Sequence, residues 1–525
     1  SGEDILEFDH VLLRDVLLQD LSGKRSLKGL HKQAAESKIE FYGDRVDSRA
    51  TEIVEHYRRA REPKGVYIYT LKAARAAANA SDLEQAMQLY REAQRLAESA
   101  NAEEADGILA DSSYVLESEE VALEVAHLER RVGEYESSRS HYRKLLGSDD
   151  FSIALWSRWG LGRLAARQSD FSEAEGWFEA ARREVRSARD LGLEEIAEVV
   201  DAHCLFEMGR LSRVRADDSN AELLYGEALE KARNWDQRDL EARILQELSG
   251  ISARALEFDE AQEYRQRAEI LAESIGDDEL IAELAVDSAE FLADRGNIEE
   301  ASQSLGDAME TFDELGANHS AGHCNLVLGR LHWRRGAYKD AAKTLRKAHK
   351  TFQNFEDTRG VTLCKYSLAR LALSIGRDKE ARSLGRAARS SFRELGDPRG
   401  AAYSELVVGR VSLREENYEE ALDRFGAALE EFEEIGDERG RSCALALRAL
   451  GLEHLERHEE VDEIIEVLQE AEASSVVTEE SFATALEEIA ELMNERSPMD
   501  AIELDEHAET VFARLGRASR ERSVQ

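Results

Sequence analysis

Residues 321–440 contain three copies of one pattern of apolar and polar positions, spaced forty residues apart. Within each copy the apolar residues recur every three or four positions, which is the spacing of one face of an α-helix. Glycine or polar residues interrupt the pattern around Gly336, Gly376 and Glu416–Asn417. Each copy therefore predicts two antiparallel helices of about 16 to 20 residues, joined by a short turn.

Small and aromatic residues fall in register when the copies are aligned. The matching positions are Gly329, Ala369 and Gly409; Ala341, Ala381 and Ala421; Ala348, Ala388 and Ala428; and Phe352, Phe392 and Phe432. Small residues recur where one helix crosses another closely, because a larger side chain would push the two backbones apart. We therefore expect these positions to form the contacts between helices.

The copies resemble the tetratricopeptide repeat. They share a Leu-Gly dipeptide on the first helix (Leu328-Gly329), an alanine twelve residues later, and an Ala-x3-aromatic sequence from Ala421 to Phe425. The period of forty and the endings Leu395-Gly396-Asp397 and Ile435-Gly436-Asp437 are similar to the longer-helix variant of that family. The resemblance implies an all-α fold, a right-handed α-solenoid whose first helices line a concave face.

The first small residue of each second helix can be followed along the chain, and it predicts about eleven antiparallel helix pairs. These residues are Ala86, Ser138, Ala174, Ala221, Ala261, Ala301, Ala341, Ala381, Ala421, Val461 and Ala501. From Ala221 onward each step is forty residues, whereas the earlier steps are 52, 36 and 47. The pattern divides the chain into irregular repeats at 46–205, regular repeats at 206–475, a degenerate capping repeat at 476–516 and a frayed tail at 517–525.

Residues 1–45 do not follow the repeat pattern. A helix around Phe8–Leu18 and a second containing Leu30-His31 and Ala34-Ala35 resemble the segment that joins the nucleotide-binding and winged-helix part of multidomain signal-transduction ATPases to their repeat arms. This resemblance implies that an ATPase or kinase domain precedes the repeats in the same polypeptide. Residues 47–60 and 66–79 are then predicted to be helices.

The formal charge of −40, from 69 basic and 109 acidic residues, disfavours direct binding to nucleic acid or to anionic membranes. No uninterrupted apolar window is long enough for a membrane span, and we expect a cytoplasmic protein. The cysteines Cys204, Cys324, Cys364 and Cys443 lack the spacing of a metal site, so we expect buried small residues.

No motif in the sequence carries catalytic chemistry. Gly23-Lys24-Arg25-Ser26 lacks the leading glycine and the preceding strand of a phosphate loop. His319 and His323 lie one helical turn apart but have no carboxylate or cysteine motif beside them. We therefore expect neither enzymatic activity nor a bound metal or cofactor.

Arginines follow the small residue of several first helices: Arg163, Arg210, Arg330, Arg370 and Arg410, with Arg334 and Arg414 one turn further on. By helical geometry their neighbours on the same face are His323, Trp333, Tyr366 and Tyr403. Arginine beside exposed aromatic residues is typical of a binding surface, here for an acidic or aromatic peptide. Alternatively, each arginine pairs with a glutamate of the adjacent repeat and only holds the stack together.

Two functions fit these observations. The first is a sensor arm that binds a partner protein, peptide or effector on its concave face and regulates an upstream signalling module. The second is a stand-alone scaffold that assembles protein partners without a nucleotide switch.

Overall fold

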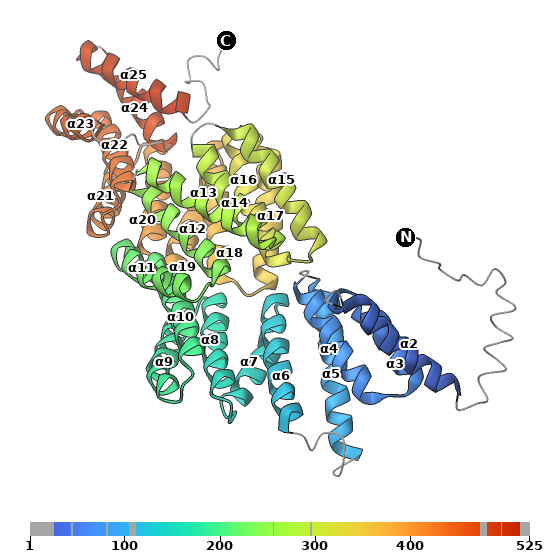
Figure 1. Ribbon diagram of the computed structural model, residues 1–525. Coiled ribbons are helices and arrows are strands. Elements are labelled where there is room, and N and C mark those ends of the chain that lie inside the picture. The colour runs from blue at the N-terminus through green and yellow to red at the C-terminus, as the bar shows by residue number, and fades with distance from the viewer. Residues whose placement is uncertain are drawn as a thin grey trace, which may run out of the picture. The chain divides into compact units, whose positions relative to one another are not determined.

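The computed structural model describes residues 26–43, 46–79, 82–103, 112–255, 257–294, 297–472, 480–494 and 496–514, which form only helices and turns. These residues belong to two compact units, divided close to Ile153 and Ala154. The helix around Phe8–Leu18 and the tail at 517–525 lie outside the described residues. Successive helices run as antiparallel pairs, as Figure 1 shows.

The helices of the first unit have these bounds: α2 (Ser26–Tyr42), α3 (Ala50–Ala60), α4 (Pro63–Asn79), α5 (Leu83–Glu103), α6 (Ser112–Val132) and α7 (Tyr135–Leu145). A 3-10 turn, η2 (Asp47–Arg49), precedes α3. The segments predicted at 47–60 and 66–79 are thus helical, apart from this first turn.

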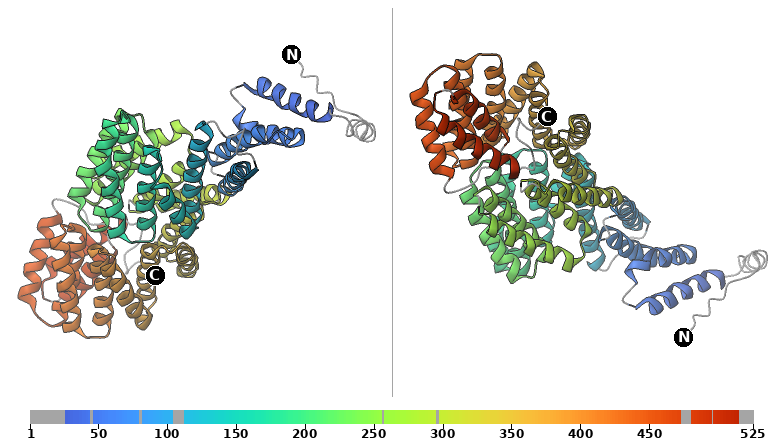
Figure 2. Two further views of the ribbon diagram at one scale, coloured as in Figure 1. Left: turned by 90° about the horizontal axis from the view of Figure 1, so that it is seen from below. Right: turned by 90° about the horizontal axis from the view of Figure 1, so that it is seen from above.

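The second unit contains the regular array, which Figure 2 shows in two further views. Its first helices are α8 (Phe151–Arg167), α10 (Glu194–Val214), α12 (Arg238–Arg254), α14 (Asp278–Asp294), α16 (Asn318–Arg334), α18 (Thr358–Ser374), α20 (Pro398–Arg414), α22 (Glu438–His454) and α24 (Glu480–Met493). Its second helices are α9 (Phe171–Asp190), α11 (Asp218–Asn234), α13 (Phe258–Ile275), α15 (Ile298–Glu314), α17 (Tyr338–Asn354), α19 (Asp378–Glu394), α21 (Tyr418–Glu434), α23 (His458–Glu472) and α25 (Pro498–Arg514).

Each of the eleven reference positions, from Ala86 to Ala501, lies in the second helix of a pair between α4–α5 and α24–α25. The all-helical solenoid of about eleven pairs is therefore confirmed, with α2 and α3 packed as a further pair before it.

Within a pair, the glycine of the first helix lets the second helix approach. A Cβ atom added at Gly329 would lie 2.7 Å from the Leu345 side chain, and one added at Gly409 would lie 2.5 Å from Phe425. Real Cβ atoms do not approach this closely, so the small residue is a packing requirement. This is the role expected from the aligned copies.

Between pairs, the phenylalanine near the end of α17, α19 and α21 packs on a glycine at the start of the next first helix. A Cβ atom at Gly400 would lie 2.6 Å from Phe392, and one at Gly440 would lie 2.3 Å from Phe432. The aspartates of the Leu-Gly-Asp and Ile-Gly-Asp endings are N-caps, since Asp397 and Asp437 accept hydrogen bonds from the Gly400 and Gly440 backbone amides. The aspartate at the end of each of these repeats therefore caps the next first helix, and the glycine three residues later packs on the phenylalanine of the preceding second helix.

The predicted turns are present. Gly336 and Gly376 have φ angles of 73° and 71°, in the left-handed region that glycine adopts readily. In the next pair Glu416 takes the same conformation, with φ of 61°. A non-glycine residue adopts this conformation at a small energetic cost, so the turn geometry is imposed by the packing of the two helices.

The first helices lie on the inner side of the curved array. From α14 to α22 each first helix contacts the first helix of the next pair directly, while the described second helices make no comparable contacts with one another. Helices on the inside of a curve are closer together than those outside, so the first helices form the inner face and the second helices the outer face.

Candidate functional site

Three rows of side chains, related by the forty-residue period, run along the inner face. The row that follows the small residue is Arg210, Gly250, Glu290, Arg330, Arg370 and Arg410. The row three residues earlier is Glu207, Glu247, Asp287, Val327, Ser367 and Val407. The third is His203, Arg243, Glu283, His323, Leu363 and Tyr403. We define these rows as the inner-face rows.

In the first half of the array, arginines and glutamates of successive pairs form a ladder. Arg163 on α8 lies 2.6 Å from Glu207 on α10, and Arg210 lies 3.2 Å from Glu247 on α12. Arg243 on α12 continues the ladder to Glu283 on α14. Each guanidinium thus bridges one helix pair to the next.

Arg330 makes the next bridge. Its Nη1 lies 2.6 Å from Glu290 on α14, and its Nε donates a hydrogen bond of 3.2 Å to Ser367 on α18. Arg330 therefore joins three consecutive first helices. A carboxylate on a ligand would have to compete with Glu290 for this side chain.

Arg370 lies against two aromatic rings. Its guanidinium lies 4.3 Å from the centre of the Trp333 ring and 5.7 Å from that of Tyr366. Trp333 is buried and donates a hydrogen bond of 2.9 Å to Ser374, so it supports Arg370 from the core and is not the exposed aromatic residue that the sequence predicted. The structure thus brings together three of the predicted residues in one cluster, held between α16 and α18.

The remaining predicted residues lie in different surroundings. The His323 side chain is exposed to solvent. Partial loss of hydration water to the surrounding protein lowers its pKa, and the positive charge of the nearby Arg330 lowers it further. Tyr403 is half-buried and packs edge-on against Phe432 of its own pair, with 4.8 Å between ring centres. Arg414 bonds to Asp378 at 3.2 Å, while Arg334 and Arg410 are half-buried on α16 and α20. Only part of the predicted set therefore forms one cluster.

The inner-face rows change sign along the array. On α10 and α12 each carboxylate of these rows is balanced by an arginine, Arg210 or Arg243, and α14 carries carboxylates alone. Helices α16, α18 and α20 supply Arg330, Arg370 and Arg410 to the same rows. Asp287 is the extreme case on the acidic side. Its side chain is exposed to solvent, but the surrounding protein displaces part of its hydration water. This desolvation, together with the nearby Glu290 and Glu283, raises the pKa of Asp287 to about 7. The face therefore has an acidic region on α14, followed by a basic half on α16, α18 and α20.

An aromatic group on α8 and α10 was not predicted from the sequence. Trp156 and Trp159 meet at right angles, with 5.3 Å between ring centres, and both contact His203. Arg163 lies 5.2 Å from the Trp159 ring, and burial lowers the pKa of His203 to about 4. Aromatic residues placed four positions before an inner-face arginine are the sequence signal that could have identified the group.

Polar side chains also connect helix pairs that are far apart in the sequence. Asp218 at the start of α11 accepts hydrogen bonds from Arg254 at 3.1 Å and from Arg399 on α20 at 2.9 Å. Arg167 at the end of α8 donates to His319 on α16 at 2.6 Å, and His319 in turn contacts Asp357 at 3.0 Å. We call Arg167, Asp218, His319 and Arg399 the seam.

Metal sites and membrane-spanning helices were also considered for the described part of the chain. The described residues contain no group of three histidines, cysteines or carboxylates that could hold a metal ion. The four cysteines are buried, as expected. None of the described helices combines the length and apolar character needed to cross a membrane.

Comparisons with known proteins agree with the fold. Residues 123–189 match the family model of the tetratricopeptide repeat. This segment contains the 36-residue step from Ser138 to Ala174, which is the step closest to the usual period of about 34. Curated protein sequences gave no match.

Among solved structures, a Rap protein complexed with competence and sporulation factor is similar over 69% of this chain and 99% of its own, with 14% identity and a TM-score of 0.52. A signal transduction ATPase with numerous domains and a tetratricopeptide repeat sensor, from Pyrococcus horikoshii, covers 89% of this chain and 72% of its own at 12% identity and a TM-score of 0.41. The family match is thus confined to residues 123–189, and the likeness to the Rap protein shows a shared helical fold. Solenoids of stacked repeats present extended concave surfaces.

Proposed function

We propose that the array is a sensor arm that binds a peptide segment of a partner protein on its inner face and thereby regulates a signalling module in the same polypeptide. The observation that carries the proposal is the cluster of Arg370 with Trp333 and Tyr366 on the basic half of that face. A guanidinium held against aromatic rings is positioned to bind a carboxylate, and the half-buried Tyr366 adds apolar contact area.

The charged and aromatic residues of the inner face indicate which side chains the bound peptide segment would carry. Arg330, Arg370 and Arg410 favour acidic side chains over α16 to α20, and the half-buried Tyr366 favours an aromatic neighbour. The carboxylates of α14 favour a basic residue at the other end of the segment. We therefore propose an extended peptide that is acidic and aromatic in one half and basic in the other.

Binding of synthetic peptides would test this proposal. A peptide alternating Glu and Phe, ending in Lys, is compared by calorimetry with a version carrying Gln for Glu. We expect the Glu version to bind at least tenfold more tightly, a difference of about 1.4 kcal/mol. The double variant Arg370→Gln, Arg410→Gln should lose this preference.

The matched control is Lys339→Gln with Lys379→Gln, exposed positions of the outer helices α17 and α19, which removes the same charge and should keep the preference. Equal binding of both peptides, or a preference that survives the inner-face double variant, would contradict the proposal.

The scaffold remains the second candidate. The resemblance of residues 8–35 to an ATPase-joining segment favours the sensor arm. If the whole polypeptide contains an ATPase, the peptide should change its hydrolysis rate. A rate that stays constant while the peptide binds would favour the scaffold.

A further inference from the structure

The outer helix α17 carries exposed cations in a chain of net charge −40. Its 17 residues include one acidic residue, Asp340, and the basic residues Lys339, Lys343, Arg346, Lys347 and Lys350. Lys343, Arg346 and Lys350 are exposed and follow the spacing i, i+3, i+7. They therefore lie along one face of the helix. We call these three residues the basic stripe.

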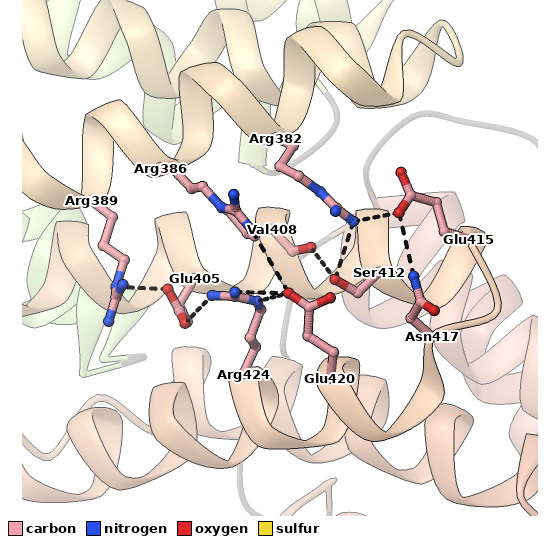
Figure 3. Close-up of polar contacts among 10 residues, drawn as sticks. All are labelled: Arg382, Arg386, Arg389, Glu405, Val408, Ser412, Glu415, Asn417, Glu420 and Arg424. Atoms are coloured by element: carbon pink, nitrogen blue, oxygen red, sulfur yellow. Dashed lines mark hydrogen bonds and ion pairs between the residues drawn. The ribbon is translucent and has the colours of Figure 1, made fainter.

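The basic stripe has no acidic partner among the described side chains. The contrast with α19 is direct, because its arginines are paired with carboxylates of the next helix pair. Arg382 lies 2.7 Å from Glu415 and Arg389 lies 2.7 Å from Glu405, in the network drawn in Figure 3. Cations on α19 therefore hold adjacent pairs together.

The equivalent pairing is not made at α17. Arg346 corresponds to Arg386, which lies 3.8 Å from Glu420, but Glu380, the equivalent of Glu420, lies 3.4 Å from Arg377 instead. The basic stripe therefore has no comparable structural role within the array.

The neighbouring outer helix α15 has the opposite charge. Its 17 residues include six acidic and no basic residues. Asp307, Glu310 and Glu314 are exposed, repeat the spacing i, i+3, i+7 and have no cationic partner among the described residues. We call them the acidic stripe. Helices α15 and α17 both pack against α16, so a single first helix connects the two outer helices that carry the stripes.

We propose that α15 and α17 together form a docking surface for a second copy of this chain. In a two-fold dimer the basic stripe of each copy faces the acidic stripe of the other, because a two-fold axis exchanges neighbouring surfaces reciprocally. The equal spacing of the stripes allows all three charges of each to meet a partner. Charge complementarity then selects this pairing over other contacts.

The large net charge does not prevent this contact. At an ionic strength of about 0.1 M the Debye length is about 10 Å, so charges elsewhere on the array are largely screened. Stripes in direct contact are affected much less. A polar interface of this kind is weak and depends on salt and on protein concentration.

Reciprocal charge reversal tests the proposal. One variant carries Lys343→Glu, Arg346→Glu and Lys350→Glu, and the other carries Asp307→Lys, Glu310→Lys and Glu314→Lys. In sedimentation at about 0.1 M ionic strength, the wild type should show a concentration-dependent dimer. Each variant alone should remain monomeric, and an equimolar mixture should form a heterodimer, because each reversed stripe then meets an opposite charge.

The control is Glu419→Lys, Asp423→Lys and Glu430→Lys on α21, which changes the net charge as much as the α15 variant on exposed positions of another outer helix. This variant should dimerise like the wild type. A monomeric wild type at every concentration, a dimer unaffected by either reversal, or a mixture that stays monomeric would overturn the proposal. A monomer that instead binds polyglutamate would assign the stripe to a different acidic partner and would also overturn it.

Discussion

Arg399 on α20 donates a hydrogen bond to Asp218 on α11, although the two residues are 181 positions apart in the chain. Repeat arrays are held mainly by contacts between neighbouring units. This bond instead joins pairs separated by several units, and Arg399 also lies 2.9 Å from Asp437 in the following pair. The seam therefore makes the curvature of the array depend on a few polar side chains.

The first prediction concerns this seam. Asp218→Asn removes the charge that Arg254 and Arg399 share, and we expect a loss of stability of about 1–3 kcal/mol because both guanidinium groups lose a charged acceptor. Hydrogen exchange should increase at the starts of both α11 and α20. The control Glu175→Gln removes the pair with Arg215, which joins neighbouring helix pairs only, and should leave exchange at α20 unchanged. Unchanged exchange at α20 in Asp218→Asn would show that the seam does not hold the array.

The second prediction concerns the contact between Phe392 and Gly400. Gly400→Ala places a Cβ atom where only 2.6 Å is available, and we expect a loss of about 1–3 kcal/mol from overpacking. Gly426→Ala is the control, since nothing lies within 4 Å of its Cβ position in α21. That substitution should stabilise the helix by about 0.5–1 kcal/mol. Thermal melting measures both, and shifts of equal sign would contradict the packing argument.

The third prediction concerns the pair formed by Arg330 and Glu290. We expect a coupling energy of about 0–1 kcal/mol in a double-mutant cycle of Arg330→Gln and Glu290→Gln, because both side chains are partly exposed. Denaturant unfolding of the four proteins provides the value. A coupling well above this range would favour a structural role for Arg330 over ligand binding.

The fourth prediction concerns pH. The pKa of Asp287 is raised to about 7, so the folded state binds its proton more tightly than the unfolded state does. The group destabilises the fold once pH exceeds the unfolded pKa of about 3.9, and the cost reaches its full value above about pH 7. Asp287→Asn should therefore raise the melting temperature at pH 8 but not at pH 4.

Solvent screening limits the gain in this variant to about 1 kcal/mol, because the Asp287 side chain is exposed. Asp313→Asn on the outer helix α15 is the matched control and should show no such pH dependence. An equal gain at pH 4 and pH 8 would contradict the proposed electrostatic origin.

The forty-residue period was sufficient to predict the helix pairs, the close contacts at Gly329 and Gly409, and the turn at Glu416, because these depend on neighbouring segments only. The seam could not be predicted in this way. The bond between Asp218 and Arg399 depends on the small rotation from one pair to the next, which accumulates over several pairs and leaves no local pattern.

The site was predicted in part for a similar reason. Arg330, Arg370 and Trp333 lie in regular pairs, where the register places them on one face. Trp156 and His203 lie where the steps are 36 and 47 residues, so alignment by forty does not place them together. The opposite charges of α15 and α17 also leave no signature in the aligned copies, because an alignment reveals the residues that the copies share.

The contact of each terminal phenylalanine with the next glycine has a consequence for how such a chain can change in length. Phe352, Phe392 and Phe432 meet equivalent glycines, so each second helix fits the first helix of any of these successors. A duplicate of residues 398–437 inserted after Asp397 would cover Phe392 with its own glycine and offer its own phenylalanine to the original Gly400. Gain or loss of whole repeats thus leaves every core covered, whereas a break inside a repeat exposes an aromatic ring. Recombination between repeats can therefore lengthen or shorten the inner face while every new contact between pairs keeps the same phenylalanine and glycine.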